Sequence, residues 1–68
     1  MKSISGQRLG KILESKGWTL KNIKGSHHVY VKAGRKERIS VPVHGSSDLK
    51  KGLLAAIMKI ADIEEKEL

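Results

Sequence analysis

The sequence predicts an α+β domain with the element order α-β-β-β-α, in which a three-stranded antiparallel sheet carries two helices on one face. Three observations lead to this prediction. Apolar residues recur at helical spacing near both ends of the chain, whereas the middle part favours strands. Short glycine-containing turns divide that middle part, as is typical of an antiparallel meander. A chain of 68 residues makes one small domain, which we expect to cover residues 1–68.

The first helix is expected to begin after Ser5, a favourable N-cap residue, and to stop at Gly17, which suits a left-handed C-terminal position. Its apolar face follows the i, i+3, i+4 spacing of a helix and consists of Leu9, Ile12 and Leu13. Gly10 weakens the intrinsic helix propensity but would allow a neighbouring element to approach closely. Trp18 is expected to anchor the following turn onto the core.

Three strands are expected at residues 18–24, 27–32 and 37–42. Residues 25–26 supply the first turn and residues 33–36 the second, while Pro42 closes the third strand. The first strand alternates imperfectly between apolar and polar residues. The second is rich in β-branched and aromatic residues, which favour a pleated sheet.

A loop over residues 43–48 leads to a second helix, expected at about residues 50–61. Its apolar stripe, widened by Leu54 and Met58, is predicted to consist of Leu49, Leu53, Ala56, Ile57 and Ile60. Gly52 near the helix start is unusual, and would permit close packing or a contact between backbone and ligand. Asp62 is expected to cap a short final turn that carries the acidic tail, residues 62–68.

The charge of the chain is strongly positive, with 14 Lys and Arg against seven Asp and Glu and a formal net charge of +7. Four of the seven acids lie in the last seven residues, so the remaining body is more basic still. Such a field attracts nucleic acid, an acidic protein or an anionic membrane, although it can also serve solubility alone.

Composition excludes several other classes. The chain has no cysteine, which excludes a disulfide framework and a thiolate metal site. The N-terminal residues lack the apolar run of a signal peptide, and no stretch is long enough to cross a bilayer. We therefore expect a cytoplasmic protein without a membrane partner.

The segment Lys24-Gly25-Ser26-His27-His28-Val29-Tyr30 offers the most specific chemistry in the chain. Two adjacent histidines follow a Gly-Ser turn and enter a strand within a very basic protein. Histidine takes up and releases protons near neutral pH, so beside a phosphate-attracting surface it is suited to breaking an RNA backbone. A histidine can deprotonate the ribose 2′-hydroxyl, or protonate the leaving 5′ oxygen; water as the nucleophile is the alternative.

The chain resembles the HicA family of bacterial toxins over nearly its whole length. The resemblance rests on the order and spacing of five segments: Ser5-Gly6, Gly17-Trp18, Gly25-Ser26-His27-His28-Val29-Tyr30, Val41-Pro42-Val43-His44 and Asp48-Leu49-Lys50-Lys51-Gly52. It implies a fold like that of double-stranded-RNA-binding domains and the activity of an mRNA interferase, an endoribonuclease of a type II toxin–antitoxin system. It also implies a HicB-type antitoxin that covers the active surface. The family's catalytic histidine falls on His27.

The alternation of side chains in the second strand conflicts with that assignment. It puts His27, Val29 and Val31 on one face and His28, Tyr30 and Lys32 on the other. On this pattern alone, His28 faces solvent and His27 turns toward the apolar side, where it would be a histidine packed at the rim of the core. A first strand residue can, however, lie beyond the edge of the helices and stay accessible. Tyr30 is expected to be half-buried, with stacking on a base as the alternative.

Several further residues are candidates for positioning RNA. We expect this role of Lys24, Ser26, His28, Lys50 and Lys51, the last two at a helix N-terminus that favours phosphate. Solvation of the surface is the alternative role for the lysines. His44 is a candidate second proton-transfer group. No metal site and no cofactor are expected, because adjacent strand histidines point to opposite faces and no carboxylate lies at ligand spacing.

Two classes of function remain open from the residues. The first is a metal-independent ribonuclease toxin that uses His27. The second is a noncatalytic basic RNA-binding module, and a weaker third option is a protein whose basic face serves only an acidic partner. With few aromatic residues available for stacking, base-specific reading should be weak, so a loose sequence preference is expected.

Overall fold

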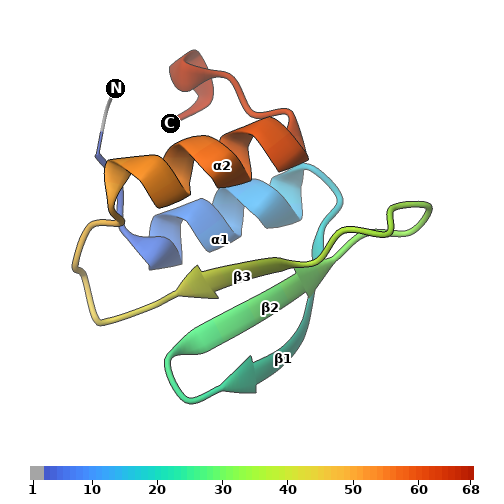
Figure 1. Ribbon diagram of the computed structural model, residues 1–68, viewed down its shortest axis with the longest axis horizontal. Coiled ribbons are helices and arrows are strands. Elements are labelled where there is room, and N and C mark those ends of the chain that lie inside the picture. Colours follow the sequence, from blue (N-terminus) through green and yellow to red (C-terminus); the bar gives the residue numbers. More distant parts are fainter. Residues whose placement is uncertain (1–2) are drawn as a thin grey trace.

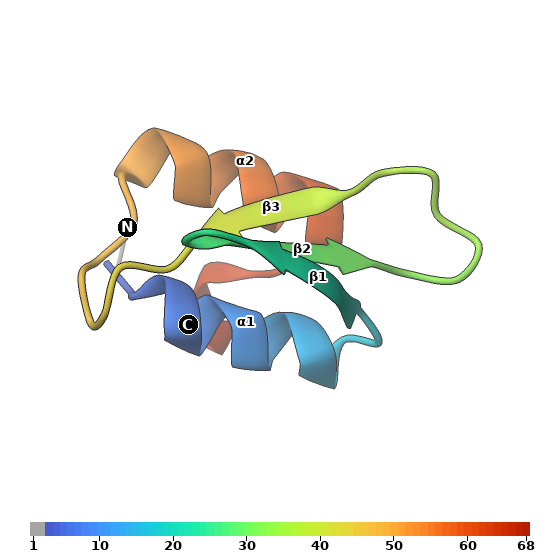
Figure 2. The ribbon, with the colours of Figure 1, turned by 90° about the horizontal axis from the view of Figure 1, so that it is seen from below.

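The computed structural model, which describes residues 3–68, has the predicted order of elements (Figure 1). The elements are α1 (Gly6–Ser15), β1 (Thr19–Lys24), β2 (His27–Val31), β3 (Ile39–Pro42), α2 (Lys51–Ala61) and a short 3₁₀ helix, η1 (Glu65–Glu67). The strands form one antiparallel sheet in the order β1-β2-β3, with β2 in the middle. Both helices lie on one side of this sheet, above it in Figure 1, and Figure 2 looks at the molecule from the sheet side. The predicted fold class is therefore confirmed.

Helix α1 begins and ends where its sequence predicts. The Ser5 hydroxyl accepts a hydrogen bond of 3.2 Å from the backbone N–H of Arg8, which satisfies one of the free donors of the first turn. Gly17 follows the helix with φ +95°, a left-handed conformation that glycine adopts without strain. Trp18 is then buried against the core, as expected.

The core lies between the sheet and the two helices. Its residues come from α1, β2, β3 and α2 and from the segments that flank the helices: Ile4, Leu9, Leu13, Trp18, Tyr30, Ile39, Val41, Leu49, Leu54, Ile57, Ala61, Ile63 and Leu68. Tyr30 is only 5% exposed, so it is a core residue and the expectation of a half-buried ring is wrong. The same burial raises the pKa of its phenol, and the negative charge of Glu14 adds to this effect.

The two faces of β2 are the reverse of what alternation alone predicts. Residues paired across antiparallel strands share a face. His28 pairs with Val41, which is buried, so His28 lies on the helix-facing side and is half-buried there. His27 pairs with Pro42 on the other side and is exposed. The prediction that His28 faces solvent is therefore wrong, and the interpretation of His27 as a histidine packed at the core's rim is wrong too.

A glycine explains why the tyrosine face of β2 turns inward. Gly10 of α1 packs directly under the Tyr30 ring, where a Cβ atom would overlap the phenolic oxygen. The absence of a side chain at Gly10 leaves room for this ring between α1 and the sheet. The close approach expected at Gly10 is thus confirmed, and its partner is an aromatic side chain of β2.

The imperfect alternation of the first strand has a structural cause. The pairing of β1 with β2 shifts between Leu20 and Asn22, so Leu20 pairs with Tyr30 whereas Ile23 pairs with His28. Such a bulge adds one residue to one strand and changes which face the following side chains occupy. Leu20 and Ile23 therefore share the helix-facing side although three positions separate them.

The apolar stripe of α2 is rotated relative to the prediction. Leu54, Ile57 and Ala61 are its buried residues, and Leu54 is completely buried. Leu53 and Ala56, predicted for the centre of the stripe, are exposed. The helix is apolar over most of its circumference, so the spacing of its residues does not define the orientation that packs on the sheet.

The C-terminal segment packs against α1, and its cap differs from the prediction. Asp62 is the C-cap of α2 in a left-handed conformation with φ 56°, whereas Glu64 is the N-cap of η1. The expectation that Asp62 caps the final turn is therefore wrong. Leu68 is buried, and its carbonyl oxygen accepts a hydrogen bond of 3.2 Å from the Arg8 guanidinium. The acidic tail is thus attached to the helical layer.

The connection between β2 and β3 is fixed by an arginine. The Arg35 guanidinium donates a hydrogen bond of 2.9 Å to the carbonyl oxygen of Ile60 near the end of α2. Its Cζ atom lies 5.6 Å from the centre of the Trp18 ring, within the range of a cation–π contact. The Nε–H of Arg35 donates a second hydrogen bond, of 3.0 Å, to the Glu37 carboxylate. One of the basic residues near the sheet therefore has a structural role.

Replacing Gly10 by alanine should lower the free energy of unfolding by about 1–3 kcal/mol, because the new methyl group would overpack a dense core. The Tyr30 ring that it meets is buried and has little room to move. Gly52→Ala is the matched control, since no atom outside the local helix backbone lies within 4 Å of the added Cβ. It should instead stabilise α2, by up to about 1 kcal/mol. Urea denaturation measures both, and equal effects of the two changes would contradict this account.

The ion pair between the tail and α1 should give the protein a defined pH dependence. The Lys16 ammonium lies 2.6 Å from the Glu67 carboxylate. The backbone N–H of Glu64 and then Lys16 hold the pKa of Glu67 below its ordinary value of 4.5. A carboxyl group with a lowered pKa stabilises the folded state above its unfolded pKa, and this contribution is lost as the pH falls through the folded value.

The melting temperature of Glu67→Gln should therefore lie below that of the wild type well above pH 4.5, and the difference should shrink on further acidification. Glutamine keeps an oxygen for the Glu64 N–H, so the change isolates the charge. A cycle with Lys16→Gln and the double variant measures the coupling between the two side chains. Additive losses would show that the ion pair contributes nothing.

Candidate functional site

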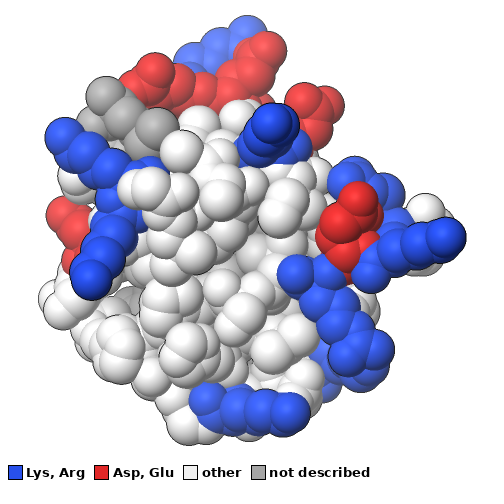
Figure 3. Space-filling model, in the orientation of Figure 1, with Lys and Arg blue, Asp and Glu red and all other residues white. Residues whose placement is uncertain are grey.

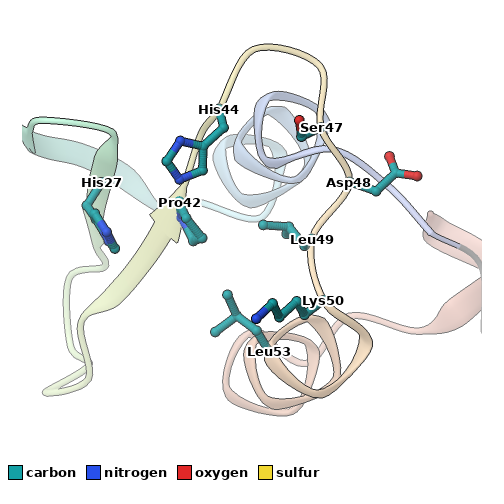
Figure 4. A pocket seen from close by; sticks show the side chains of 8 residues that line it. All are labelled: His27, Pro42, His44, Ser47, Asp48, Leu49, Lys50 and Leu53. Carbon is teal, nitrogen blue, oxygen red and sulfur yellow. The ribbon is translucent and has the colours of Figure 1, made fainter.

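A pocket of about 300 Å³ opens where β2 begins and β3 ends (Figure 4). The loop after β3 and the first turn of α2 close its other sides. Eight residues line it: His27, Pro42, His44, Ser47, Asp48, Leu49, Lys50 and Leu53. The pocket brings together a histidine of the sheet, a histidine of the loop and a lysine at the start of a helix, although 23 positions separate His27 from Lys50.

His27 is exposed at the first position of β2, directly after the turn at residues 25–26. Its Nδ1 atom lies 3.2 Å from the Ser40 hydroxyl of β3. This contact crosses between neighbouring strands on the face of the sheet that bears no helix, and it fixes the orientation of the ring. The Nε2 atom remains available for a ligand, which is the arrangement that a proton-transferring histidine needs.

His44 comes from the loop after β3 and lines the same pocket. Its Nε2 atom lies 3.5 Å from the Ser26 hydroxyl, in the turn that precedes His27. The same turn holds the loop through the backbone, because the Val43 N–H donates a hydrogen bond of 2.6 Å to the Ser26 carbonyl oxygen. Figure 4 shows the His44 ring extending from the loop toward the side of the pocket where His27 and Pro42 lie.

The far end of this loop is held to the segment before α1. Ser5 and Asp48 form an isolated antiparallel bridge, and the Leu49 N–H donates a hydrogen bond of 2.8 Å to the Ile4 carbonyl oxygen. Lys50 follows as the N-cap residue of α2. Its side chain therefore stands beside the free backbone N–H groups of the first helical turn, which together favour an anionic ligand.

The other predicted site residues differ in their position relative to the pocket. Lys24 is the cross-strand partner of His27 and is exposed. Ser26 reaches the pocket through its contact with His44. Lys51 is the first residue of α2 and is exposed, but it does not line the pocket. His28 lies on the opposite face of β2 from His27, so the two adjacent histidines do not act on one ligand from the same side.

The sequence did not indicate the places of Ser40, which contacts His27, and of Leu53, which lines the pocket. Ser40 was not singled out, although its place two residues before Pro42 puts it on the same face of β3 as the partner of His27. Leu53 was assigned to the core but is 37% exposed and lines the pocket. Alternation along β3 was the available signal for Ser40, whereas nothing in the spacing of α2 distinguishes Leu53 from its buried neighbour.

Charges are distributed unevenly around the site. Figure 3 shows an uncharged central area over α2 and β3, with Lys and Arg side chains around its rim and acidic side chains near the C-terminal segment. Three of the acids belong to η1 and its N-cap, Glu64, Glu65 and Glu67. Two of these carboxylates form ion pairs with lysines, Glu67 with Lys16 and Glu64 with Lys66. The tail is thus held at α1 and its C-cap, and none of its residues lines the pocket.

Comparison with known proteins identifies the family. The family described as the HicA toxin of bacterial toxin–antitoxin systems matches residues 6–63, which includes every strand, both α-helices and all of the pocket. The chain belongs to the HicA toxin family. A solved structure titled "HicA3 and HicB3 toxin-antitoxin complex" is similar, with a TM-score of 0.67 and 36% sequence identity. The match covers 87% of this chain and 94% of that one.

The HicA assignment agrees with the α-β-β-β-α order, which is the double-stranded-RNA-binding-domain-like arrangement that the resemblance implied. No curated protein sequence gives a significant match to this HicA chain. Within residues 3–68, no helix is long and apolar enough to cross a membrane. The same residues contain no group of three or more His, Asp or Glu side chains arranged to hold a metal ion.

Proposed function

We propose that this HicA protein is an mRNA interferase, the toxin of a type II toxin–antitoxin system, and that His27 is its catalytic residue. The observation that carries the proposal is the place of His27: exposed, at the mouth of a pocket, with Nδ1 engaged by Ser40 and Nε2 free. Membership of a toxin family supports the biological role, and the net charge of +7 supports an RNA substrate. The reaction needs no metal or other cofactor.

His27 acts in this proposal as the general base. Its Nε2 atom takes the proton of a ribose 2′-hydroxyl, and the resulting oxygen attacks the adjacent phosphorus. The reaction requires RNA because DNA lacks the 2′-hydroxyl. General acid–base catalysis contributes about 10²–10⁴-fold to a rate, which suffices for a slow endonuclease.

The RNA backbone is positioned by the polar and basic residues around His27. Lys50 and the N-terminus of α2 bind a phosphate within the pocket, and Lys51 supports them from the next position. Lys24 binds a second phosphate beside His27, since the two residues are cross-strand partners. Ser26 contacts the ribose–phosphate chain at the turn. The contact expected of His28 remains a prediction, with a smaller effect because this ring lies on the helix-facing side.

Lys50→Ala should weaken RNA binding several-fold more than Lys59→Ala. The two changes remove the same charge from the same helix, but Lys50 lines the pocket, whereas Lys59 is exposed in the last turn of α2. Binding of a noncleavable 2′-deoxy oligonucleotide, followed by fluorescence anisotropy at several salt concentrations, measures the difference. Equal losses would mean that the lysines act only through the overall field of the protein.

A HicB-type antitoxin is the proposed protein partner, and it would act by covering the pocket. The solved relative is titled as a HicA3–HicB3 complex, and the match covers 94% of the similar chain in that structure. The uncharged area over α2 and β3 adjoins the pocket and includes the exposed Leu53, which suits a protein contact better than an RNA contact. Both partners of HicA would then compete for one region, in the cytoplasm where mRNA is found.

The experiment that tests the function is cleavage of a defined mRNA by the purified protein in the presence of EDTA. We expect fragments that end in a 2′,3′-cyclic phosphate, and no cleavage after a nucleotide that lacks the 2′-hydroxyl. Fragments that end in 3′-hydroxyl would indicate water as the nucleophile. Tight RNA binding without any cleavage would favour the second candidate, a noncatalytic RNA-binding module. Expression in bacteria should arrest growth, and co-expression with a HicB-type protein should restore it.

A further inference from the structure

The pocket contains a second imidazole that the proposed role of His27 does not use. We infer that His44 is a further catalytic residue, which donates a proton to the leaving 5′ oxygen while His27 accepts the proton of the 2′-hydroxyl. This inference rests on the proposed ribonuclease function and adds to it the identity of the general acid. The comparisons establish the family and assign no role to this loop residue.

The fold brings the two histidines to one place. His27 and His44 belong to different elements, yet both line one pocket, and they share the turn at residues 25–26 as a support. Ser26 precedes His27 directly, and its hydroxyl lies 3.5 Å from Nε2 of His44. The Ser26 carbonyl oxygen accepts a hydrogen bond of 2.6 Å from the backbone N–H of Val43, at the start of the loop. Ser26 thus links the start of the strand that carries His27 to the loop that carries His44.

The free ring nitrogens also support the inference. Ser40 occupies Nδ1 of His27, which leaves Nε2 for substrate. Ser26 occupies Nε2 of His44, which leaves Nδ1. Each histidine therefore has one nitrogen bound to a serine hydroxyl and one free. Two such groups that face a single scissile phosphate can act on its two reacting oxygens, whereas one imidazole reaches both only by moving.

The remaining polar residues of the pocket are less suited to donate this proton. Figure 4 shows the Asp48 carboxylate on the far side of the pocket from both histidines. Carboxyl groups ordinarily lose their proton near pH 4, and lysine ammonium groups ordinarily keep theirs to about pH 10, so neither type matches proton donation at neutral pH as imidazole does. Lys50 is therefore assigned to the phosphate, and the Ser47 hydroxyl can form hydrogen bonds but does not give up its proton near neutral pH.

The proposed reaction moves one proton at each of the two reacting oxygens. Neutral His27 takes the proton from the 2′-hydroxyl, and a bond forms between the 2′ oxygen and phosphorus. The bond between phosphorus and the 5′ oxygen breaks, and protonated His44 gives its proton to that oxygen. The products are a 2′,3′-cyclic phosphate and a 5′-hydroxyl. His27 is left protonated and His44 neutral, and exchange with solvent restores both.

An RNA with sulfur in place of the scissile 5′ oxygen tests the assignment, because a thiolate leaves without a proton. His44→Ala should lower cleavage of the natural RNA by about 10²-fold or more, the usual contribution of a general acid. On the 5′-thio RNA, His44→Ala should cleave at a rate close to that of the wild type. His27→Ala should be slow on both RNAs, because its role concerns the attacking oxygen.

Two controls separate the possible results. Ser46→Ala changes an exposed residue of the same loop that does not line the pocket, and it should leave both rates unchanged. Thermal melting of each variant reports whether the loop change affects folding. The inference would be overturned if His44→Ala lowered the cleavage rates of the two RNAs equally, or if this variant cleaved the natural RNA as fast as the wild type. Either result would leave the ribonuclease function intact. A wild-type protein that cleaves neither RNA would instead overturn the function itself.

Discussion

His27→Ala should lower the rate of RNA cleavage by about 10²–10⁴-fold, the range that a positioned general base contributes. The side chain is exposed at the start of β2, and its hydrogen bond is a single contact with the Ser40 hydroxyl, so its removal leaves no buried group unpaired. The folded structure should therefore persist. Initial rates on a defined mRNA, with the fragment ends identified by mass spectrometry, provide the measurement.

Ser40→Ala is the informative companion to His27→Ala. It removes the hydroxyl that orients the ring while the imidazole stays in place. As a positioning residue, Ser40 should affect the catalytic rate more than RNA binding, and Ser40→Thr should restore part of the rate because it restores the hydroxyl. In cells, His27→Ala should no longer arrest growth or degrade mRNA. Equal toxicity of the wild type and His27→Ala would exclude His27 as the catalytic residue.

Leu54→Ala should have the largest effect on stability among the substitutions considered. Its side chain, in the first half of α2, is completely buried, and truncation of such a leucine costs about 2–5 kcal/mol. A domain of 68 residues has roughly 3–10 kcal/mol of stability in total. A large fraction of the molecules should therefore be unfolded at 37 °C, which urea denaturation and circular dichroism will show.

The matched control for Leu54→Ala is the same substitution one position earlier. Leu53 is 37% exposed and lines the pocket, so Leu53→Ala should cost far less stability. Its effect should appear in binding of the proposed HicB-type antitoxin, where an exposed leucine beside the pocket would add apolar contact area. Similar losses of stability in the two variants would show that α2 packs in a different orientation from the one described.

The order of elements and most of their ends were predictable from local signals. Ser5 and Gly17 define α1 because capping and left-handed glycine are properties of a few neighbouring residues. The short helix after α2 was also foreseen, but its cap was misassigned. Asp62 and Glu64 are both acidic, and the difference between them is the left-handed backbone at Asp62, which no local pattern specifies.

Which face is buried was the harder question, both in β2 and in α2. Alternation separates His27 from His28 correctly, but Val29 and Val31 made their own face look like the apolar one. The inward face is decided by the space at Gly10, which lies on another element and accepts the Tyr30 ring. In α2, nearly all sides of the helix are apolar. Its orientation is therefore also determined by packing against other elements rather than by its own residue pattern.

The candidate site was predicted in part. His27 came from the family resemblance rather than from the pattern of β2, which argued against it. Lys50 could be expected near a phosphate because it stands at a helix start. The joint position of His27, Ser40 and His44 was not predictable, because it depends on how β3 pairs with β2 and where the following loop turns back.

The origin of the pocket in distant parts of the chain has a consequence for the order of folding. His27 comes from the central strand, His44 from the loop after β3, and Leu53 from the last α-helix. Contacts between positions so far apart form only when the intervening chain has closed its loop. During synthesis, a chain whose α2 has not yet emerged from the ribosome has no assembled pocket. The RNA cleavage that we propose for this pocket is therefore expected only after α2 has left the ribosome and packed on the sheet.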